Sequence, residues 1–164
     1  MSDIQTNGQD GAAAPSLTIN AQYLRDLSFE NPRAPESLLN QGGVPEVRID
    51  VDVKARQLNP DVYESVISLK VEAQQASQVA FVVEVDYGCV VTIKNAPQDL
   101  VAALVLIEAP RIVFPFVRAV VADATRDGGF PPLMINPIDF TEVQRRKAAQ
   151  AQGQQPEAPV PANA

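Results

Sequence analysis

The chain has 164 residues, of which 46% are hydrophobic, and this length suits a single domain with one core. Its 13 basic and 20 acidic residues give a formal charge of -7, which argues against a nucleic-acid partner because a phosphate backbone attracts basic surfaces. The sequence contains no histidine, which excludes a Ser-His-Asp triad and any histidine-containing zinc site, and no glycine-rich phosphate loop precedes a lysine. We therefore expect no enzyme, no metal and no cofactor.

Both ends of the chain are polar and lack a hydrophobic period. Residues 1–16 are rich in glycine and alanine and residues 150–164 in glutamine, alanine and proline, so each is predicted to be a disordered tail beside one domain over residues 17–149. The first residues show no basic segment followed by an apolar run, and the most apolar stretch, Leu100–Ile107, is shorter than the roughly 20 residues that span a bilayer. These features indicate a cytoplasmic protein without direct membrane insertion.

The strands are predicted from the alternation of apolar and polar residues. Residues Leu17–Leu24 look extended, and turn-forming residues between Ser28 and Gly43 predict a long connector. Alternation is clearest over residues 45–54, where apolar side chains alternate with charged ones and predict a strand with one dry and one wet face. Three further strands are predicted over Val62–Ala73, Val79–Asp86 and Cys89–Lys94. Four such strands joined by short turns predict an antiparallel meander or a near relative.

Helical spacing follows the strands. Apolar residues recur at this spacing from Leu100 to Ala124, with an interruption at Pro110. Pro115 is costly in a helix interior, so we expect it in a first turn or at a kink. Residues Phe140–Gln150 predict a short terminal helix. The order of elements predicts an α+β fold: a four-stranded antiparallel sheet, one long helix with a proline kink, and a short C-terminal helix.

Two kinds of side chain in the strands can carry chemistry. The single Cys89 cannot form an intramolecular disulfide and, within an apolar strand, is expected to be a buried structural thiol. The carboxylate pairs Asp50 with Asp52 and Glu84 with Asp86 are of a kind that a glycosidase or a metal site can use. Both pairs lie on predicted wet faces, so we favour a solvated surface over catalysis or metal binding.

Seven segments between Tyr23 and Phe140 form a pattern through their order and spacing. They are Tyr23–Pro35, Pro45–Val47, Asp61–Glu64, Ala80–Phe81, Ala109–Arg118, Gly129–Pro131 and Asn136–Phe140. Together they resemble SecB, the family of bacterial protein-export chaperones, in its proteobacterial type. Because the similarity extends over most of the chain in one order, it is far more specific than a single short motif.

The resemblance implies a homotetramer assembled as a dimer of dimers, with a four-stranded antiparallel sheet and a long helix in each subunit. It also implies an activity that needs no ATP: the protein would hold unfolded secretory precursors in hydrophobic grooves and deliver them to the translocation motor SecA. The residues agree with this interpretation, because the chain combines an acidic surface with more apolar surface than one small domain needs.

The family pattern and the predicted faces suggest which residues make these contacts. Unfolded polypeptide is expected to contact Tyr23, Phe29, Val47, Ile49, Val51, Phe130, Leu133, Ile138 and Phe140. SecA is expected to contact Asp26, Glu30, Val82 and Glu84. The long helix has surplus apolar surface, which predicts an oligomer interface at Val113, Phe116, Val117, Val120 and Val121. Ordinary core is the alternative for the apolar residues, and a solvated sheet face is the alternative for the acidic ones.

The predicted C-terminal helix departs from the family pattern because it is mostly polar. Only Phe140 and Val143 are available to a groove wall, so we expect a shallower groove or a more mobile helix, and the basic residues 145–147 suit the helix dipole. Three alternative functions stay open. They are a SecB-like chaperone dedicated to one toxin-antitoxin system, an oligomeric adaptor that does not bind unfolded chains, and a carrier of a small apolar ligand.

Overall fold

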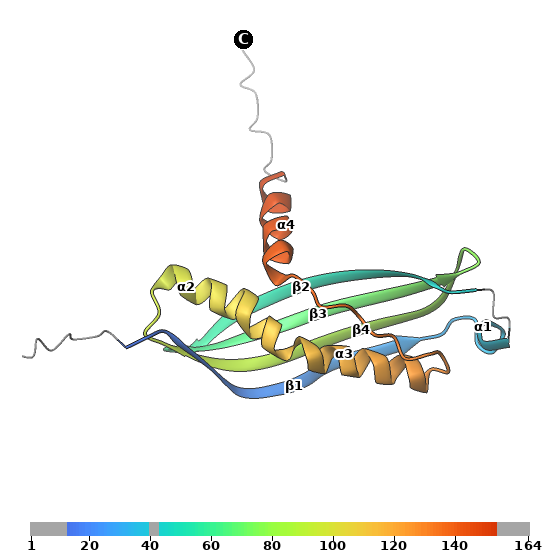
Figure 1. The fold of residues 1–164 in the computed structure, drawn as a ribbon, viewed down its shortest axis with the longest axis horizontal. Coiled ribbons are helices and arrows are strands. Elements are labelled where there is room, and N and C mark those ends of the chain that lie inside the picture. The colour runs from blue at the N-terminus through green and yellow to red at the C-terminus, as the bar shows by residue number, and fades with distance from the viewer. Residues whose placement is uncertain (1–12, 40–42, 154–164) are drawn as a thin grey trace, which may run out of the picture.

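The computed structural model describes residues 13–39 and 43–153, which form a four-stranded sheet with a long helix on one face (Figure 1). The strands are β1 (Ser16–Glu30), β2 (Glu46–Asn59), β3 (Val62–Gln75) and β4 (Gln78–Lys94), and their order in the sheet is β1-β4-β3-β2. All neighbouring strands are antiparallel, which confirms the predicted fold class. Of the predicted tails, residues 1–12 and 154–164 lie outside the described residues.

The predicted strands differ from the observed ones mainly in three places, and the first is β2, which continues past Lys54 to Asn59. β1 continues to Glu30, so it takes in the start of the predicted connector, in which only the short α1 (Glu36–Leu39) is helical. β4 is one strand rather than two, because the chain continues through Gly88 without a break. Gly88 is tolerated because its missing side chain makes room for Tyr23 of β1: a Cβ atom there would lie 2.5 Å from Cζ of the tyrosine ring.

The long helix is one continuous run of α2 (Gln98–Ala103), the π-helical η1 (Leu104–Glu108) and α3 (Ala109–Asp127). Pro110, not Pro115, occupies the first turn of α3, where a missing N–H costs little. Pro115 lies inside α3 and is exposed. The carbonyl group that loses its partner is that of Arg111, four residues earlier, and Arg111 is also exposed, so water can reach this part of the helix.

The same helical run is long and apolar enough to cross a membrane, with a mean hydropathy of 2.1 in its most apolar window. Length and composition alone do not distinguish such a span from the core helix of a soluble protein. Here the helix lies along the sheet, and Val113, Val117 and Val121 are at most 1% exposed. This packing supports the interpretation as a core helix.

The helix crosses the sheet diagonally (Figure 1). η1 packs on β2 and β3, whereas α3 packs on β4, β1 and β3. Val53 of β2 and Leu24 of β1 lie in one row of paired residues, and Val53 is fully buried while Leu24 is 46% exposed. Further along the sheet the order is reversed: Ile49 of β2 is 39% exposed, and Phe29 of β1 in the same row is half-buried. The helix therefore leaves the first part of β2 uncovered.

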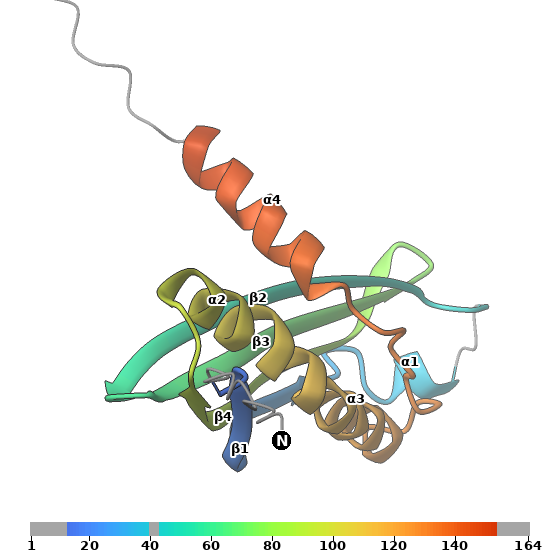
Figure 2. The same cartoon turned by 60° about the vertical axis from the view of Figure 1, so that its left-hand side comes forward.

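The C-terminal helix α4 (Phe140–Gly153) begins beside β2 and points away from the sheet (Figure 2). Asp139 caps it, because its Oδ1 accepts backbone N–H bonds from the first turn at 2.9 and 3.2 Å. Phe140 and Val143 anchor the helix, at 1% and 5% exposed. The predicted helix is confirmed, and it continues past the expected end at Gln150.

Candidate functional site

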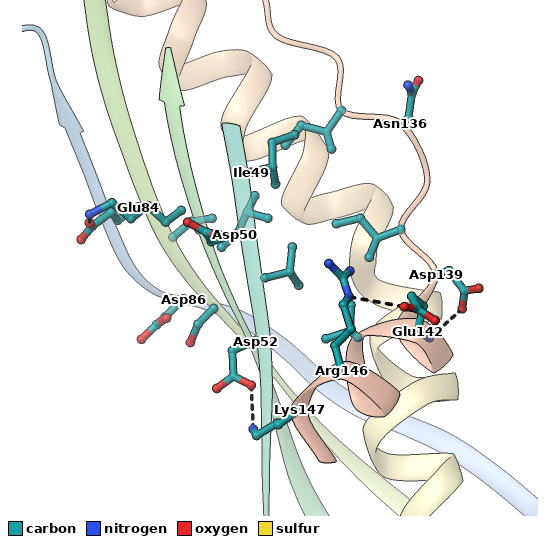
Figure 3. A pocket seen from close by; sticks show the side chains of 18 of the residues that line it. Ile49, Asp50, Asp52, Glu84, Asp86, Asn136, Asp139, Glu142, Arg146 and Lys147 are labelled. Atoms are coloured by element: carbon teal, nitrogen blue, oxygen red, sulfur yellow. Dashed lines mark hydrogen bonds and ion pairs between the residues drawn. The ribbon is translucent and has the colours of Figure 1, made fainter. Parts of the chain in front are cut away.

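The uncovered part of β2 forms one wall of an apolar groove. The segment that links α3 to α4 passes this part of β2 and forms the opposite wall (Figure 1). We define the β2 groove by its apolar lining residues Ile49, Val51, Ile135, Ile138 and Val143. The hollow has a volume of about 920 Å³ and continues round β2, because Asp50, Asp52, Glu84 and Asp86 also line it (Figure 3). Apolar residues therefore line one part of the hollow and charged residues the rest.

Three aromatic rings lie near the start of β2, and we call them the aromatic cluster. The rings of Phe29 and Phe81 stack with centroids 5.9 Å apart, and Phe130 tilts against Phe81 at 4.8 Å. Phe81 lies in the same row of paired residues as Val47, the first apolar residue of β2. Phe81 is buried, whereas Phe29 and Phe130 are half-buried, so parts of these two rings can meet a ligand.

Most residues expected to contact unfolded polypeptide lie in the uncovered part of β2, in the aromatic cluster or in the link between α3 and α4. They are Phe29, Val47, Ile49, Val51, Phe130, Leu133 and Ile138, all half-buried or exposed. Phe140 differs, because it packs edge-on against Phe114 at 6.0 Å inside the core. Tyr23 also differs, because it lies on the face of the sheet away from the helix. The structure therefore brings neither of them to the groove surface.

Tyr23 belongs to a polar network on this outer face. Its ring lies over Gly88 of β4, and its hydroxyl donates a hydrogen bond to Glu64 of β3. Arg56 of β2 donates from Nε to the other carboxylate oxygen at 2.5 Å, so one carboxylate links β1, β2 and β3. These hydrogen bonds, from Arg56 first and Tyr23 second, hold the pKa of Glu64 below its ordinary value although the residue is only 6% exposed.

Glu64→Gln is expected to destabilise the protein by about 1–3 kcal/mol at neutral pH, because charge-assisted hydrogen bonds to a buried group are lost. A carboxyl group with a lowered pKa in the fold stabilises it above the unfolded pKa, near 4.5, and this contribution disappears as the pH falls through the folded pKa. The difference in free energy of unfolding between wild type and E64Q should therefore shrink below pH 4.5. Urea unfolding across this range measures it, and a difference independent of pH would contradict the role of the carboxylate.

The residues expected to contact SecA lie together on the outer face, on the neighbouring strands β1 and β4. We define the outer acidic face as Asp26, Glu30, Glu84 and Asp86. Asp26 pairs with Asp86 in the strand ladder, and Glu30 pairs with Val82, which is half-buried. Lys70 of β3 forms an ion pair with Glu84 at 2.6 Å. The structure thus places the expected carboxylates on one face of the sheet, with Glu30 directly opposite Val82 and Asp26 four residues earlier on β1.

Lys147 of α4 makes a contact that the sequence did not predict. Its Nζ donates to Oδ1 of Asp52 at 2.6 Å and to the backbone carbonyl of Val53 at 2.9 Å, and so ties α4 to the edge of β2 (Figure 3). Arg145 and Arg146 instead pair with Glu142 of their own helix. The helix dipole was therefore an incomplete explanation for these basic residues, and no local sequence pattern points to a partner so far along the chain.

The residues expected at an oligomer interface divide into two groups. The valines that face the sheet are buried in the subunit itself: Val113, Val117 and Val121. Val120 is half-buried and Phe116 is 47% exposed, and Ile112, one turn earlier on α3, is 48% exposed. Leu24 and Leu27 of β1 are 46% and 40% exposed. The apolar surface available to a second subunit therefore includes residues that the sequence did not single out.

Cys89 is a free, fully buried thiol, and burial raises its pKa to about 11. A thiol with this pKa is protonated at neutral pH, which confirms the predicted structural role. Among the residues that the structure describes, no group of three or more Cys, Asp or Glu side chains could hold a metal ion. Of the carboxylates considered for chemistry, Asp52 is engaged by Lys147 and Glu84 by Lys70.

Comparison with known proteins gives one consistent family. The model for the family described as preprotein translocase subunit SecB matches residues 10–151. Protein-export protein SecB of Afipia carboxidovorans is 44% identical over 160 residues, which cover 97% of this chain and 99% of that protein. The proteins of the same name from Paramagnetospirillum magneticum and Rhodospirillum centenum are each 45% identical, and cover 96% and 86% of this chain and 100% and 88% of their own lengths.

Among solved structures, the fold is similar to that of the SecB-like chaperone of Mycobacterium tuberculosis, determined in complex with a ChAD peptide from the HigA1 antitoxin. The TM-score is 0.58 at 16% identity, and the match covers 74% of this chain and 90% of the other. At this identity the likeness concerns the fold alone. SecB proteins are chaperones rather than enzymes. From the family match and from relatives that cover nearly its whole length, this chain belongs to the SecB family of protein-export chaperones.

Proposed function

We propose that the protein binds unfolded secretory precursors in the β2 groove, holds them in the cytoplasm without ATP, and delivers them to SecA. The observation that carries this proposal is the diagonal crossing of the helix, which leaves Ile49 39% exposed within an apolar wall. A folded protein has already buried its own apolar segments. An uncovered groove of this kind therefore favours chains that have yet to fold.

The strength of such binding follows from area and from repetition. Burial of apolar surface contributes about 25 cal/mol per Å² to the free energy of binding. Association and ordering of the client cost several kcal/mol, so a single groove binds weakly. Several grooves on one oligomer bind one client in succession. After the first contact, the local concentration of the next segment is high, and overall retention rises by roughly 10² to 10⁴.

A homotetramer, assembled as a dimer of dimers, supplies these repeated grooves. Phe116 and Ile112 on α3 support subunit association because each leaves about half of its apolar side chain in water. Leu24 and Leu27 extend this apolar surface to β1, which is an edge strand of the sheet formed by the described residues, and an edge strand can pair with another chain. Because Val113, Val117 and Val121 are already buried, we assign the interface to the exposed residues.

SecA docks, in this proposal, on the outer acidic face. Carboxylates on the same face as the half-buried Val82 attract a basic partner over a distance and make its capture sensitive to salt. The face lies on the opposite side of the sheet from the helix. Because Asp26, Glu84 and Asp86 also line the hollow that contains the β2 groove, SecA would bind next to a held client.

Light scattering of the purified protein, with and without an unfolded secretory precursor and without nucleotide, tests the proposal. We expect a particle of four subunits that suppresses aggregation of several unrelated precursors, because the groove recognises apolar surface rather than one sequence. Capture of a single client would indicate a chaperone dedicated to one toxin-antitoxin system. Failure to capture any client would favour an oligomeric adaptor or a small-ligand carrier.

A further inference from the structure

A second hollow lies on the outer face of the sheet, and more positive than negative side chains line it. It has a volume of about 380 Å³, and the cations Arg25, Lys54 and Arg56 line it together with the carboxylates Glu64 and Asp86. Three cations against two carboxylates contrast with the charge of -7 on the chain as a whole. The volume is large enough for one or two side chains of a partner.

A β-bulge in β1 brings Arg25 into this hollow. Leu24 pairs with Tyr87 and Asp26 pairs with Asp86, so Arg25 is the extra residue between them. In a regular strand, neighbouring residues point to opposite faces, and only one of Arg25 and Asp26 would face outwards. The bulge directs both to the outer face, so a cation and a carboxylate stand side by side.

The charges in the hollow are not balanced from within. Glu64 already accepts hydrogen bonds from Arg56 and from Tyr23. Arg25 and Lys54 are exposed, and in residues 13–39 and 43–153 neither forms an ion pair. These two cations are therefore available to an anionic group from outside the chain.

The hollow is continuous with the outer acidic face. Ser68 and Asp86 line both this hollow and the larger one that includes Asp26 and Glu84. A single docked segment can therefore touch the cations and the carboxylates together.

We propose that the hollow of Arg25 and Lys54 receives an acidic side chain of SecA, while basic side chains of the same SecA segment meet Asp26 and Glu84. This inference rests on the proposed docking of SecA at the outer acidic face. A partner recognised in this way must carry both signs of charge at matching positions. A protein that carries only basic side chains can pair with the carboxylates but not with the hollow. Arg25 and Lys54 repel such a protein.

Titration of SecA at low salt against two double variants tests the inference. Arg25→Gln with Lys54→Gln removes the two cations and leaves Arg56 to hold Glu64, and we expect roughly a tenfold loss of affinity. The sign of the effect is informative, because the same change makes the protein more acidic and would strengthen the binding of a purely basic partner. Arg48→Gln with Lys94→Gln is the matched control, since both are outer-face cations that line neither hollow.

The second variant, Asp26→Asn with Glu84→Gln, separates the two proposals. We expect it to weaken SecA binding as well, and far-ultraviolet circular dichroism should show an unchanged fold for every variant. Suppose that the Asp26 and Glu84 variant binds SecA more weakly, whereas the Arg25 and Lys54 variant binds as tightly as the control or more tightly. Only the inference that SecA inserts an acidic side chain is then overturned. If the Asp26 and Glu84 variant binds SecA as tightly as the wild type, the docking of SecA on the outer acidic face is overturned, and the inference with it.

Discussion

Ile49→Asp is expected to lower the affinity for an unfolded precursor by about tenfold or more at each groove while leaving the fold intact. Ile49 is 39% exposed, so the carboxylate stays in water in the free protein. When an apolar client segment covers the site, the charge must lose that water, and the apolar contact is lost as well. Fluorescence titration with a labelled, permanently unfolded precursor measures the effect, and light scattering reports whether the variant has the same particle mass as the wild type.

Leu58→Asp is the matched control for this experiment. Leu58 is also 39% exposed and lies on the same strand, but at the far end from the groove, whose lining does not include it. We expect client affinity close to that of the wild type. Equal losses in the two variants, or no loss in I49D, would remove Ile49 from the client site.

Gly88→Ala is expected to destabilise the protein by about 2–4 kcal/mol, because the new methyl group displaces the Tyr23 ring and its hydrogen bond to Glu64. A Cβ atom at this position would lie 2.5 Å from Cζ of that ring, and β4 is an inner strand that cannot shift freely. Urea unfolding measures the change, at one fixed protein concentration so that any subunit association affects wild type and variant alike.

A double-mutant cycle with Tyr23→Ala assigns this cost to the ring. Once the ring is removed, Gly88→Ala should cost much less, so the two changes should not be additive. Gly153→Ala controls for the substitution itself, because no atom lies within 4 Å of a Cβ there. A full cost for G88A in the Tyr23→Ala background would show that strand geometry, rather than the ring, requires glycine.

The sequence predicted the faces of β2 correctly and failed where contacts cross between strands. Alternation over residues 45–54 placed Val47, Ile49 and Val51 together on the dry face, and the structure has them together on the face that carries the helix. Tyr23 was expected in the client groove, but the space above Gly88 and the carboxylate of Glu64 hold it on the outer face. Neither partner is near Tyr23 in the sequence, so no local pattern indicates the contact.

Glycine and proline illustrate the same limit. Gly88 predicts a turn when it is considered with its neighbours, yet it continues a strand because a side chain from β1 needs its space. Pro115 was not expected in the interior of a helix, but it lies on the exposed side of α3. In both cases a local preference of modest size yields to packing with the rest of the fold.

The amino-acid sequence by itself determined the α+β order of elements, the wet and dry faces of the strands and the buried thiol of Cys89, because these follow from local periodicity. It also determined membership of the SecB family, because the order of residues is shared with relatives. Only the tertiary structure decided which dry-face residues are covered. Val53 and Ile49 are equivalent in pattern, yet the helix buries the first completely and leaves the second 39% exposed. The path of the helix across the sheet depends on packing between segments far apart in the chain, and this packing opens the β2 groove.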